Sequence, residues 1–172
     1  MVRLWVLFLV LAMAAVPAIS ASDVVFVDPM GLFQTSIPRE WVYQAQQSRE
    51  GLSVFYGPGN HNLVYFEILE PVTYSDAGAF LDYVATMLAG PGGLEGFQIE
   101  EGPKECIFHA EEAASVTYSF KAGGGHRQKE YRLIVLVGEN RAVSITISDA
   151  QESFAATKLA LETVFTEWRW LF

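Results

Sequence analysis

Residues 114–148, ASVTYSFKAGGGHRQKEYRLIVLVGENRAVSITIS, decide the fold class of this chain. Alternate residues from Ala114 to Phe120 are apolar, which is the two-residue period of a strand with one buried face. Residues 131–137 are apolar at every position but one, as expected for a central strand covered on both faces. Residues 142–148 alternate again and place Val143, Ile145 and Ile147 inward and three hydroxyl side chains outward. Turn residues at 123–125 and 138–140 join the three runs into an antiparallel meander.

Shorter strand-like runs surround this stretch. They lie at 24–27, 33–37, 52–56 and 63–69, with weaker runs at 96–101 and 105–109. Apolar residues at helical spacing predict a helix over 76–88, with Ser75 as its N-cap, and the sequence GPGG at 90–93 ends it. A closing helix is predicted to start near Gln151. This order predicts an α+β fold, an antiparallel β-sheet with helices packed on its faces, as a single domain over residues 23–172.

The first 22 residues differ from the rest of the chain. Arg3 is followed by an unbroken apolar run over 4–16, then by Pro17 and small residues up to Ser22. This is the layout of a cleavable secretory signal, with cleavage after Ser20 or Ser22. The apolar run is well short of the ~20 residues that span a bilayer as a helix. We therefore expect an exported protein, periplasmic or extracellular, without a stable membrane span once the signal is removed.

Charge and cysteine content exclude some partners. The chain carries 20 acidic and 11 basic residues, a net charge of −9, which argues against nucleic acid and against anionic membrane surfaces as partners. The one cysteine, Cys106, has no second cysteine with which to form an internal disulfide. Packing alone must then stabilise the domain, which fits a bacterial envelope better than a disulfide-rich extracellular module.

Signals for catalysis, metals or cofactors are weak. Cys106 and His109 form the only close Cys/His pair, and the sequence offers no complete set of zinc ligands in motif spacing. No G-x-S-x-G motif is present, and the glycines at 123–125 do not open a helix as a phosphate-binding loop does. We therefore expect no metal, no cofactor and no enzymatic activity. An enzyme that uses Cys106 as a nucleophile remains an alternative.

Two segments are candidates for contact with a partner. Trp168, Trp170 and Phe172 alternate at the end of the sequence, where they either cap the core or form an exposed docking patch. His126 and Arg127 follow the triple glycine, which is a candidate mobile flap. These five residues are the predicted interaction residues.

The segment Phe26–Trp41, FVDPMGLFQTSIPREW, resembles the opening of PsbP-like and Mog1-like domains, in which a turn with glycine leads into a strand that ends in an Ile-Pro-x-x-Trp step. Here that step is Ile37, Pro38 and Trp41, and the resemblance covers roughly residues 24–170. It implies an α/β/α sandwich around an antiparallel sheet. It also implies mostly non-enzymatic work, including a photosystem subunit, a nuclear factor that binds a small GTPase, bacterial envelope proteins and chaperone-like relatives.

The export signal argues against the nuclear role within this resemblance. The absence of a cysteine near the signal departs from the lipid-anchored cyanobacterial photosystem relatives. The function we expect is that of an exported, non-catalytic envelope protein that binds a partner protein. A small-molecule or lipid-binding domain with an apolar pocket between sheet and helix is the alternative from a different class.

Overall fold

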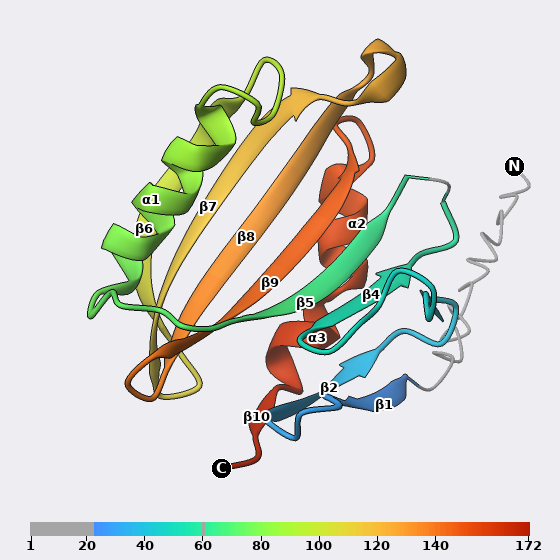
Figure 1. Cartoon of the computed structure of the whole chain (residues 1–172). Helices are drawn as coiled ribbons and strands as arrows, with labels where there is room; N and C mark the ends of the chain where they lie inside the picture. Colours follow the sequence, from blue (N-terminus) through green and yellow to red (C-terminus); the bar gives the residue numbers. More distant parts are fainter. Residues whose placement is uncertain (1–22, 60) are drawn as a thin grey trace, which may run out of the picture.

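A seven-stranded antiparallel sheet forms the centre of the computed structural model, which describes residues 23–59 and 61–172 (Figure 1). The predicted meander is present as β7 (Glu111–Lys121), β8 (Arg127–Val137) and β9 (Arg141–Ala150), and these strands are longer than the alternating patterns alone indicated. From one edge to the other, the strands are β3 (Val42–Tyr43), β4 (Leu52–Tyr56), β5 (Leu63–Leu69), β9 (Arg141–Ala150), β8 (Arg127–Val137), β7 (Glu111–Lys121) and β6 (Gln98–Phe108). The predicted export signal lies outside the described residues.

A second, three-stranded sheet consists of β1 (Val24–Val27), β2 (Phe33–Ile37) and β10 (Arg169–Trp170), with β2 in the middle. Trp170 pairs with Phe33, so the last residues of the sequence return to the first strands. After β2, the Trp41 backbone N–H donates to the Pro38 carbonyl at 2.9 Å, and Trp41 is buried. The Ile-Pro-x-x-Trp step therefore turns the chain and places its tryptophan in the core.

Helix α1 (Ala77–Ala89) begins one residue later than the sequence indicated. Asp76, and not Ser75, is the N-cap, and its Oδ1 accepts a hydrogen bond from the Ala79 backbone N–H at 2.6 Å. The predicted closing helix is divided into α2 (Phe154–Ala160) and α3 (Glu162–Thr166). The break falls at the fully buried Leu161, because α2 packs on β9 whereas α3 packs on β2. The triple glycine forms a short 3-10 turn, η1 (Gly123–Gly125).

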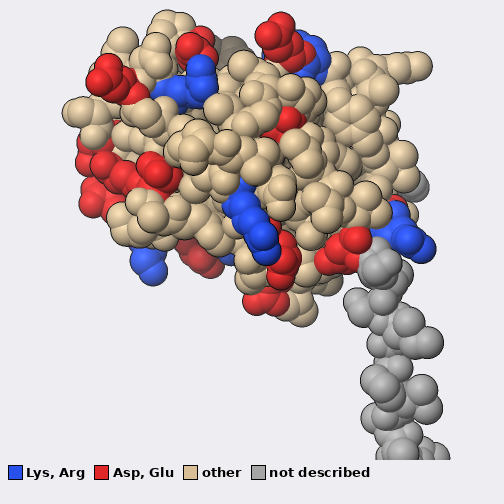
Figure 2. All heavy atoms as spheres, turned by 90° about the horizontal axis from the view of Figure 1, so that it is seen from below, with Lys and Arg blue, Asp and Glu red and all other residues tan. Residues whose placement is uncertain are grey.

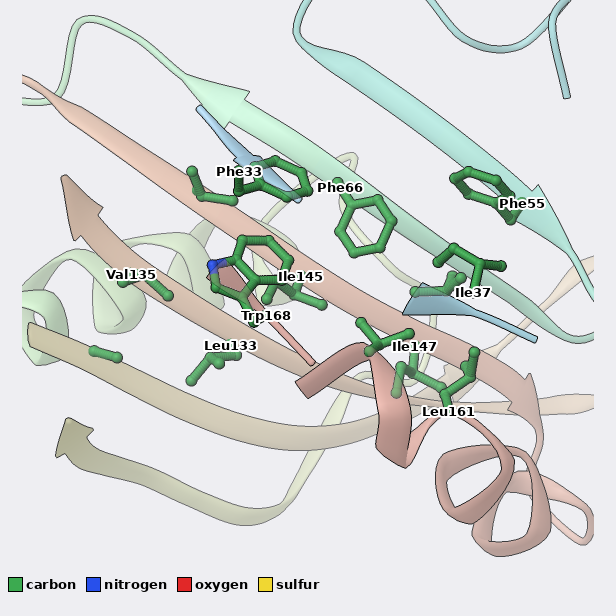
Figure 3. Packing of buried hydrophobic residues seen from close by; sticks show 14 of the residues in the cluster. Phe33, Ile37, Phe55, Phe66, Leu133, Val135, Ile145, Ile147, Leu161 and Trp168 are labelled. Atoms are coloured by element: carbon green, nitrogen blue, oxygen red, sulfur yellow. The ribbon is translucent and has the colours of Figure 1, made fainter. Parts of the chain in front are cut away.

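Apolar residues form one core on each face of the main sheet. Leu133 and Val135 of β8 lie in the larger core, and Ile134 between them lies in the smaller core under α1. In the larger core, Phe33 stacks on Trp168 with ring centroids 4.0 Å apart (Figure 3). Strand β8 is thus covered on both faces around these residues, as its continuous apolar sequence predicts.

The helices cover different strands on the two faces of the main sheet. Helix α1 contacts β6, β7 and β8 on one face, whereas α2 lies on β9 on the other face, together with α3 and the small sheet (Figure 1). Two areas of the main sheet consequently have no helix over them. One is the α1 side of β9 and β5, and the other is the α2 side of β6 and β7 at the end that includes Thr117.

The two edges of the main sheet differ in form. Strand β3 has only two residues, whereas β6 has eleven and most of them are exposed. The pairing of β6 with β7 shifts between Ile99 and Glu101 and again between Glu101 and Lys104. Pro103 lies within the second shift and has no backbone N–H to offer a further strand.

Candidate functional site

The α1 side of β5, β9 and β8 carries a hydrogen-bonded set of polar side chains, which we call the polar face. The strand register places Tyr65, Thr146 and Arg132 in one row across the three strands. Arg132 Nη2 donates to the Tyr65 hydroxyl at 2.7 Å, so these two long side chains meet above the shorter Thr146 between them. The polar face consists of Tyr65, Tyr118, Gln128, Glu130, Arg132, Ser144, Thr146 and Ser148.

The neighbouring row extends this set toward the end of the strands. Ser148 pairs with Glu130, and Glu130 pairs with Tyr118 on β7. The Tyr118 hydroxyl donates to the Glu130 carboxylate. Gln128 Nε2 donates to Ser148 Oγ and to the His61 carbonyl, both at 3.1 Å. The hydrogen bonds therefore join β7, β8 and β9 to the segment that leads into β5.

The hydroxyl side chains of β9 are more buried than their pattern indicates. Alternation places Ser144, Thr146 and Ser148 outward, on the side opposite the larger core, and the structure confirms that side. Ser144 and Thr146 nevertheless have 0% of their surface exposed. Larger side chains on β5 and β8 lie on either side of them and exclude water. The outward-facing side chains of β9 are therefore buried and not exposed to solvent.

Burial and hydrogen bonding set the charge states on this face. Burial alone would lower the pKa of Arg132, but interactions with Tyr65, Tyr118 and Glu130 raise it overall, so the guanidinium stays charged. Burial raises the pKa of Tyr65 and, together with Glu130, that of Tyr118, so both phenols stay protonated. The Nε of Arg132 is buried and has no hydrogen-bond partner among the described residues. The face holds one fixed positive charge next to one carboxylate.

A hollow of about 310 Å³ lies at one end of the polar face, lined in part by Glu130, Gln128 and His61. His61 and His126 lie at this end with their ring centroids 6.4 Å apart. The predicted contact residue His126 is exposed here and borders the polar face beyond η1. Its neighbour Arg127 differs, because it donates to Ser119 Oγ at 2.5 Å and to Gln98 Oε1 at 2.9 Å. Arg127 is thus held in place by intramolecular hydrogen bonds.

The aromatic residues at the end of the sequence divide between core and surface. Trp168 has 2% of its surface exposed and lies in the core, which is the first of the two arrangements that the sequence left open. Its stacking on Phe33 explains why this tryptophan faces inward. Trp170 is half-buried, and Phe172 is 69% exposed. The structure places Trp170 beside Phe108, at the opposite end of β6 and β7 from His126 and Arg127, so the two predicted contact segments do not form one site.

Cys106 and His109 have different surroundings in the structure. Cys106 is half-buried against the larger core, and burial raises the pKa of its thiol. His109 lies in the turn after β6, where its Nε2 is 2.7 Å from the Phe165 carbonyl oxygen. In residues 23–59 and 61–172, no group of three or more His, Cys, Asp or Glu side chains is arranged to hold a metal ion. A protonated thiol is a poor nucleophile, which disfavours Cys106 as a catalytic residue.

Acidic side chains gather on the side of the molecule where α1 and β6 lie. Figure 2 shows them on the left of the face seen from below. Asp76, Asp82 and Glu105 line a hollow of about 560 Å³ there. The Glu112 carboxylate accepts a hydrogen bond from the Ala77 backbone N–H at 3.0 Å, so part of this charge stabilises the start of α1. None of the helices in the described part of the chain has the length and apolar character needed to cross a membrane.

The chain is similar to three solved structures over most of its length. It matches the Ran-binding protein Mog1p of Saccharomyces cerevisiae with a TM-score of 0.62 and 11% identity, over 87% of this chain and 96% of Mog1p. It matches cyanobacterial PsbP from Synechocystis with a TM-score of 0.62 and 11% identity, over 92% and 98% of the two chains. The fold is PsbP/Mog1-like. A third structure with this fold is LpqN, involved in cell envelope biogenesis of Mycobacterium tuberculosis, with a TM-score of 0.60, 10% identity and coverage of 88% and 91%.

At such identities these structures establish the PsbP/Mog1-like fold alone. No protein-family profile and no curated protein sequence matches the chain. Within this fold, the polar face is the feature that the sequence analysis missed. Its signal was Arg132, the single charged residue in an otherwise apolar β8 core run, opposite the hydroxyl-bearing positions of β9.

Proposed function

We propose that this chain is an exported, non-catalytic accessory protein that binds a partner protein through its polar face. The observation that carries the proposal is the pair formed by Arg132 and the half-buried Tyr65, which lies beside the area of β9 and β5 that no helix covers (Figure 1). Arginine and tyrosine are the residues most enriched, with tryptophan, at the energetic centres of protein interfaces. A buried guanidinium also costs desolvation energy that an apolar side chain would not, so its presence suits recognition better than stability.

The similar structures support an accessory role. Mog1p is a Ran-binding protein, and LpqN is involved in cell envelope biogenesis. A domain with this fold can therefore work by binding a protein or as part of an envelope process. Export is supported by the signal-like first 22 residues. The half-buried, protonated Cys106 supports a non-catalytic role.

Site-specific photo-crosslinking in the cells that produce the protein tests this function. A photoreactive amino acid at Tyr56 or Glu67, which are half-exposed beside the polar face, is expected to give one discrete protein adduct. The same amino acid at the exposed Glu139, in the turn between β8 and β9, is the matched control and is expected to give none. The proposal fails if all three positions give the same adducts.

The affinity for the crosslinked partner then tests the polar face against the end of the sequence. Glu67→Arg and Gln128→Ala are expected to weaken binding about ten-fold each, whereas Glu139→Arg is expected to have no effect. If Phe172→Ser abolishes binding and the two polar-face variants do not, the contact surface is the aromatic segment and the polar face is excluded.

A further inference from the structure

A hollow of about 460 Å³ lies on the opposite side of the main sheet from the polar face, between α2–α3 and the area of β6, β7 and β8 that these helices leave open. This volume is within the range of about 300–1,000 Å³ that is typical of small-molecule sites. We call it the helix groove. Its lining residues are Glu101, Thr117 and Lys129 from the sheet and Phe154, Ala155, Lys158, Leu159, Glu162 and Phe165 from the helices.

The wall formed by the helices is apolar and partly unprotected. Leu159 on α2 is 70% exposed although it lines the groove. Phe154 and Phe165 lie in the same wall, the first buried and the second half-buried. Apolar surface gains about 25 cal/mol per Å² when it is removed from water. A ligand with a hydrocarbon chain along this wall would remove apolar surface from water, and most of that surface would belong to Leu159.

Two lysines enter the groove, and only one of them is paired. Lys129 Nζ lies 2.6 Å from Glu100 Oε2, so its charge is already neutralised. Lys158 Nζ lies 4.0 Å from the centre of the Tyr131 ring and forms no ion pair with any residue in the described part of the chain. Tyr131 and Thr117 are register partners, so the ring that holds Lys158 lies beside a residue that lines the groove. The groove therefore presents one fixed ammonium group beside an apolar wall.

The carboxylates at the rim limit the charge that a ligand can carry. Glu101 and Glu162 line the groove together with Lys158, and the whole chain has a net charge of −9. A doubly charged phosphate would be repelled by these groups more strongly than a single carboxylate. A cationic ligand would meet the unpaired ammonium of Lys158. Among anionic amphiphiles, one whose polar end has a single negative charge and lies directly on Lys158 meets the least repulsion.

We propose that the helix groove binds a free long-chain monocarboxylate, with its carboxylate on Lys158 and its hydrocarbon chain along Phe154, Leu159 and Phe165. This site is independent of the polar face, because the two lie on opposite sides of the main sheet. The proposed partner-binding role does not require a small-molecule ligand, so this proposal adds a ligand class to it. The occupant is a single dissolved molecule and not a membrane surface.

Calorimetric titration of the mature protein with laurate, below the concentration at which laurate forms micelles, tests the proposal. We expect saturable binding of one laurate per chain. Dodecyltrimethylammonium has the same chain length and the opposite charge, and it is expected to bind at least about ten-fold more weakly. Equal or tighter binding of the cation, or the absence of saturable laurate binding, overturns the proposal.

Matched surface variants separate the two parts of the groove without removing a core residue. Leu159→Asp is expected to weaken laurate binding at least about ten-fold, whereas Met87→Asp, at a similarly exposed position of α1, is expected to leave it unchanged. Lys158→Met is expected to abolish the preference for laurate over the cation. Lys121→Met, at an exposed lysine outside the groove, is the control. Equal effects of Leu159→Asp and Met87→Asp would exclude the groove as the site.

Two further probes exclude other sources of the same chemistry. The first probe is an apolar peptide with a free C-terminal carboxylate. If this peptide binds to the groove and laurate does not bind, the occupant of the groove is a protein chain and the proposal is overturned. Sedimentation of the protein with laurate-free phosphatidylglycerol vesicles, lost in Leu159→Asp, would assign it to a membrane and overturn it likewise. The photo-crosslinking expected at Tyr56 and Glu67 does not depend on any of these outcomes.

Discussion

Arg132 on β8 and Tyr65 on β5 are joined by a hydrogen bond of 2.7 Å that passes over Thr146 on the strand between them. The contact bridges two strands that are not neighbours in the sheet. It fixes the position of a charged side chain that is largely buried on this face. The polar face therefore has a fixed shape before any partner arrives, which lowers the conformational cost of binding.

A double-mutant cycle measures this bridge. Arg132→Met is expected to destabilise the protein by about 2 kcal/mol, because the Tyr65 hydroxyl loses its donor and the positive charge near Glu130 is removed. Tyr65→Phe removes only the hydroxyl and is expected to cost about 1 kcal/mol. Urea denaturation of the two single variants and the double variant should give a coupling energy of about 1 kcal/mol. Strict additivity would show that the hydrogen bond contributes nothing to stability.

The three aromatic residues at the end of the sequence should differ sharply in their effect on stability. Trp168→Ala is expected to cost about 4 kcal/mol, because it removes a buried ring stacked on Phe33. Phe172→Ala is expected to change the free energy of unfolding by less than about 0.5 kcal/mol, because Phe172 is exposed. Denaturation followed by circular dichroism measures both. A large loss in Phe172→Ala would contradict the division between core and surface described above.

The thiol of Cys106 should react slowly at neutral pH. Burial raises its pKa above the ordinary value of 9.0, so the thiolate is scarce in the folded protein. Alkylation by iodoacetamide at pH 8 is expected to be several-fold slower than in the urea-unfolded chain, with a rate that still rises above pH 9. Faster alkylation in the folded state would instead identify an activated thiol and restore Cys106 as a candidate nucleophile.

Glu100 should contribute to stability only above mildly acidic pH. Hydrogen bonds from Lys129 and Ser119 lower the pKa of its carboxyl group below the ordinary value of 4.5. A lowered pKa in the folded state means that the contribution is present above pH 4.5 and is lost as the pH falls through the folded value. Glu100→Gln should therefore be less stable than the natural chain at pH 7, and the difference should shrink below pH 4.5. A difference that is independent of pH would contradict this.

The sequence predicted the parts of the fold that follow a regular period. The alternating residues of β7 and β9 and the continuous apolar run of β8 specify which side of the sheet each residue faces, and the structure confirms them. The break at Leu161 was missed, because the stripe of Phe154, Leu161 and Phe165 fits one helix as well as two short ones. The chain turns at Leu161 because α2 packs on β9 and α3 packs on β2, and the relative positions of these two strands are known only from the structure.

The candidate site could be predicted less well than the fold. Outward residues on a strand are usually solvated, and only the three-dimensional row of Tyr65, Thr146 and Arg132 shows that this outward side is dry. Trp168 illustrates the same limit in reverse. Its alternation with Trp170 and Phe172 gave no sign of Phe33, more than a hundred residues earlier, on which it stacks. In both cases the burial of the residue depends on contacts with residues far away in the sequence. A local sequence pattern carries no information about such contacts.

The interrupted edge strand β6 has a consequence for the behaviour of the protein at high concentration. A straight, fully exposed strand of this length would offer its free backbone groups to an identical strand from another molecule, and such pairing can continue into fibrils. The two register shifts and Pro103 deny a neighbour a regular ladder, while the opposite edge is too short to serve as a template. We therefore expect these molecules to remain separate at high concentration, so that their surfaces stay available for the contacts proposed here.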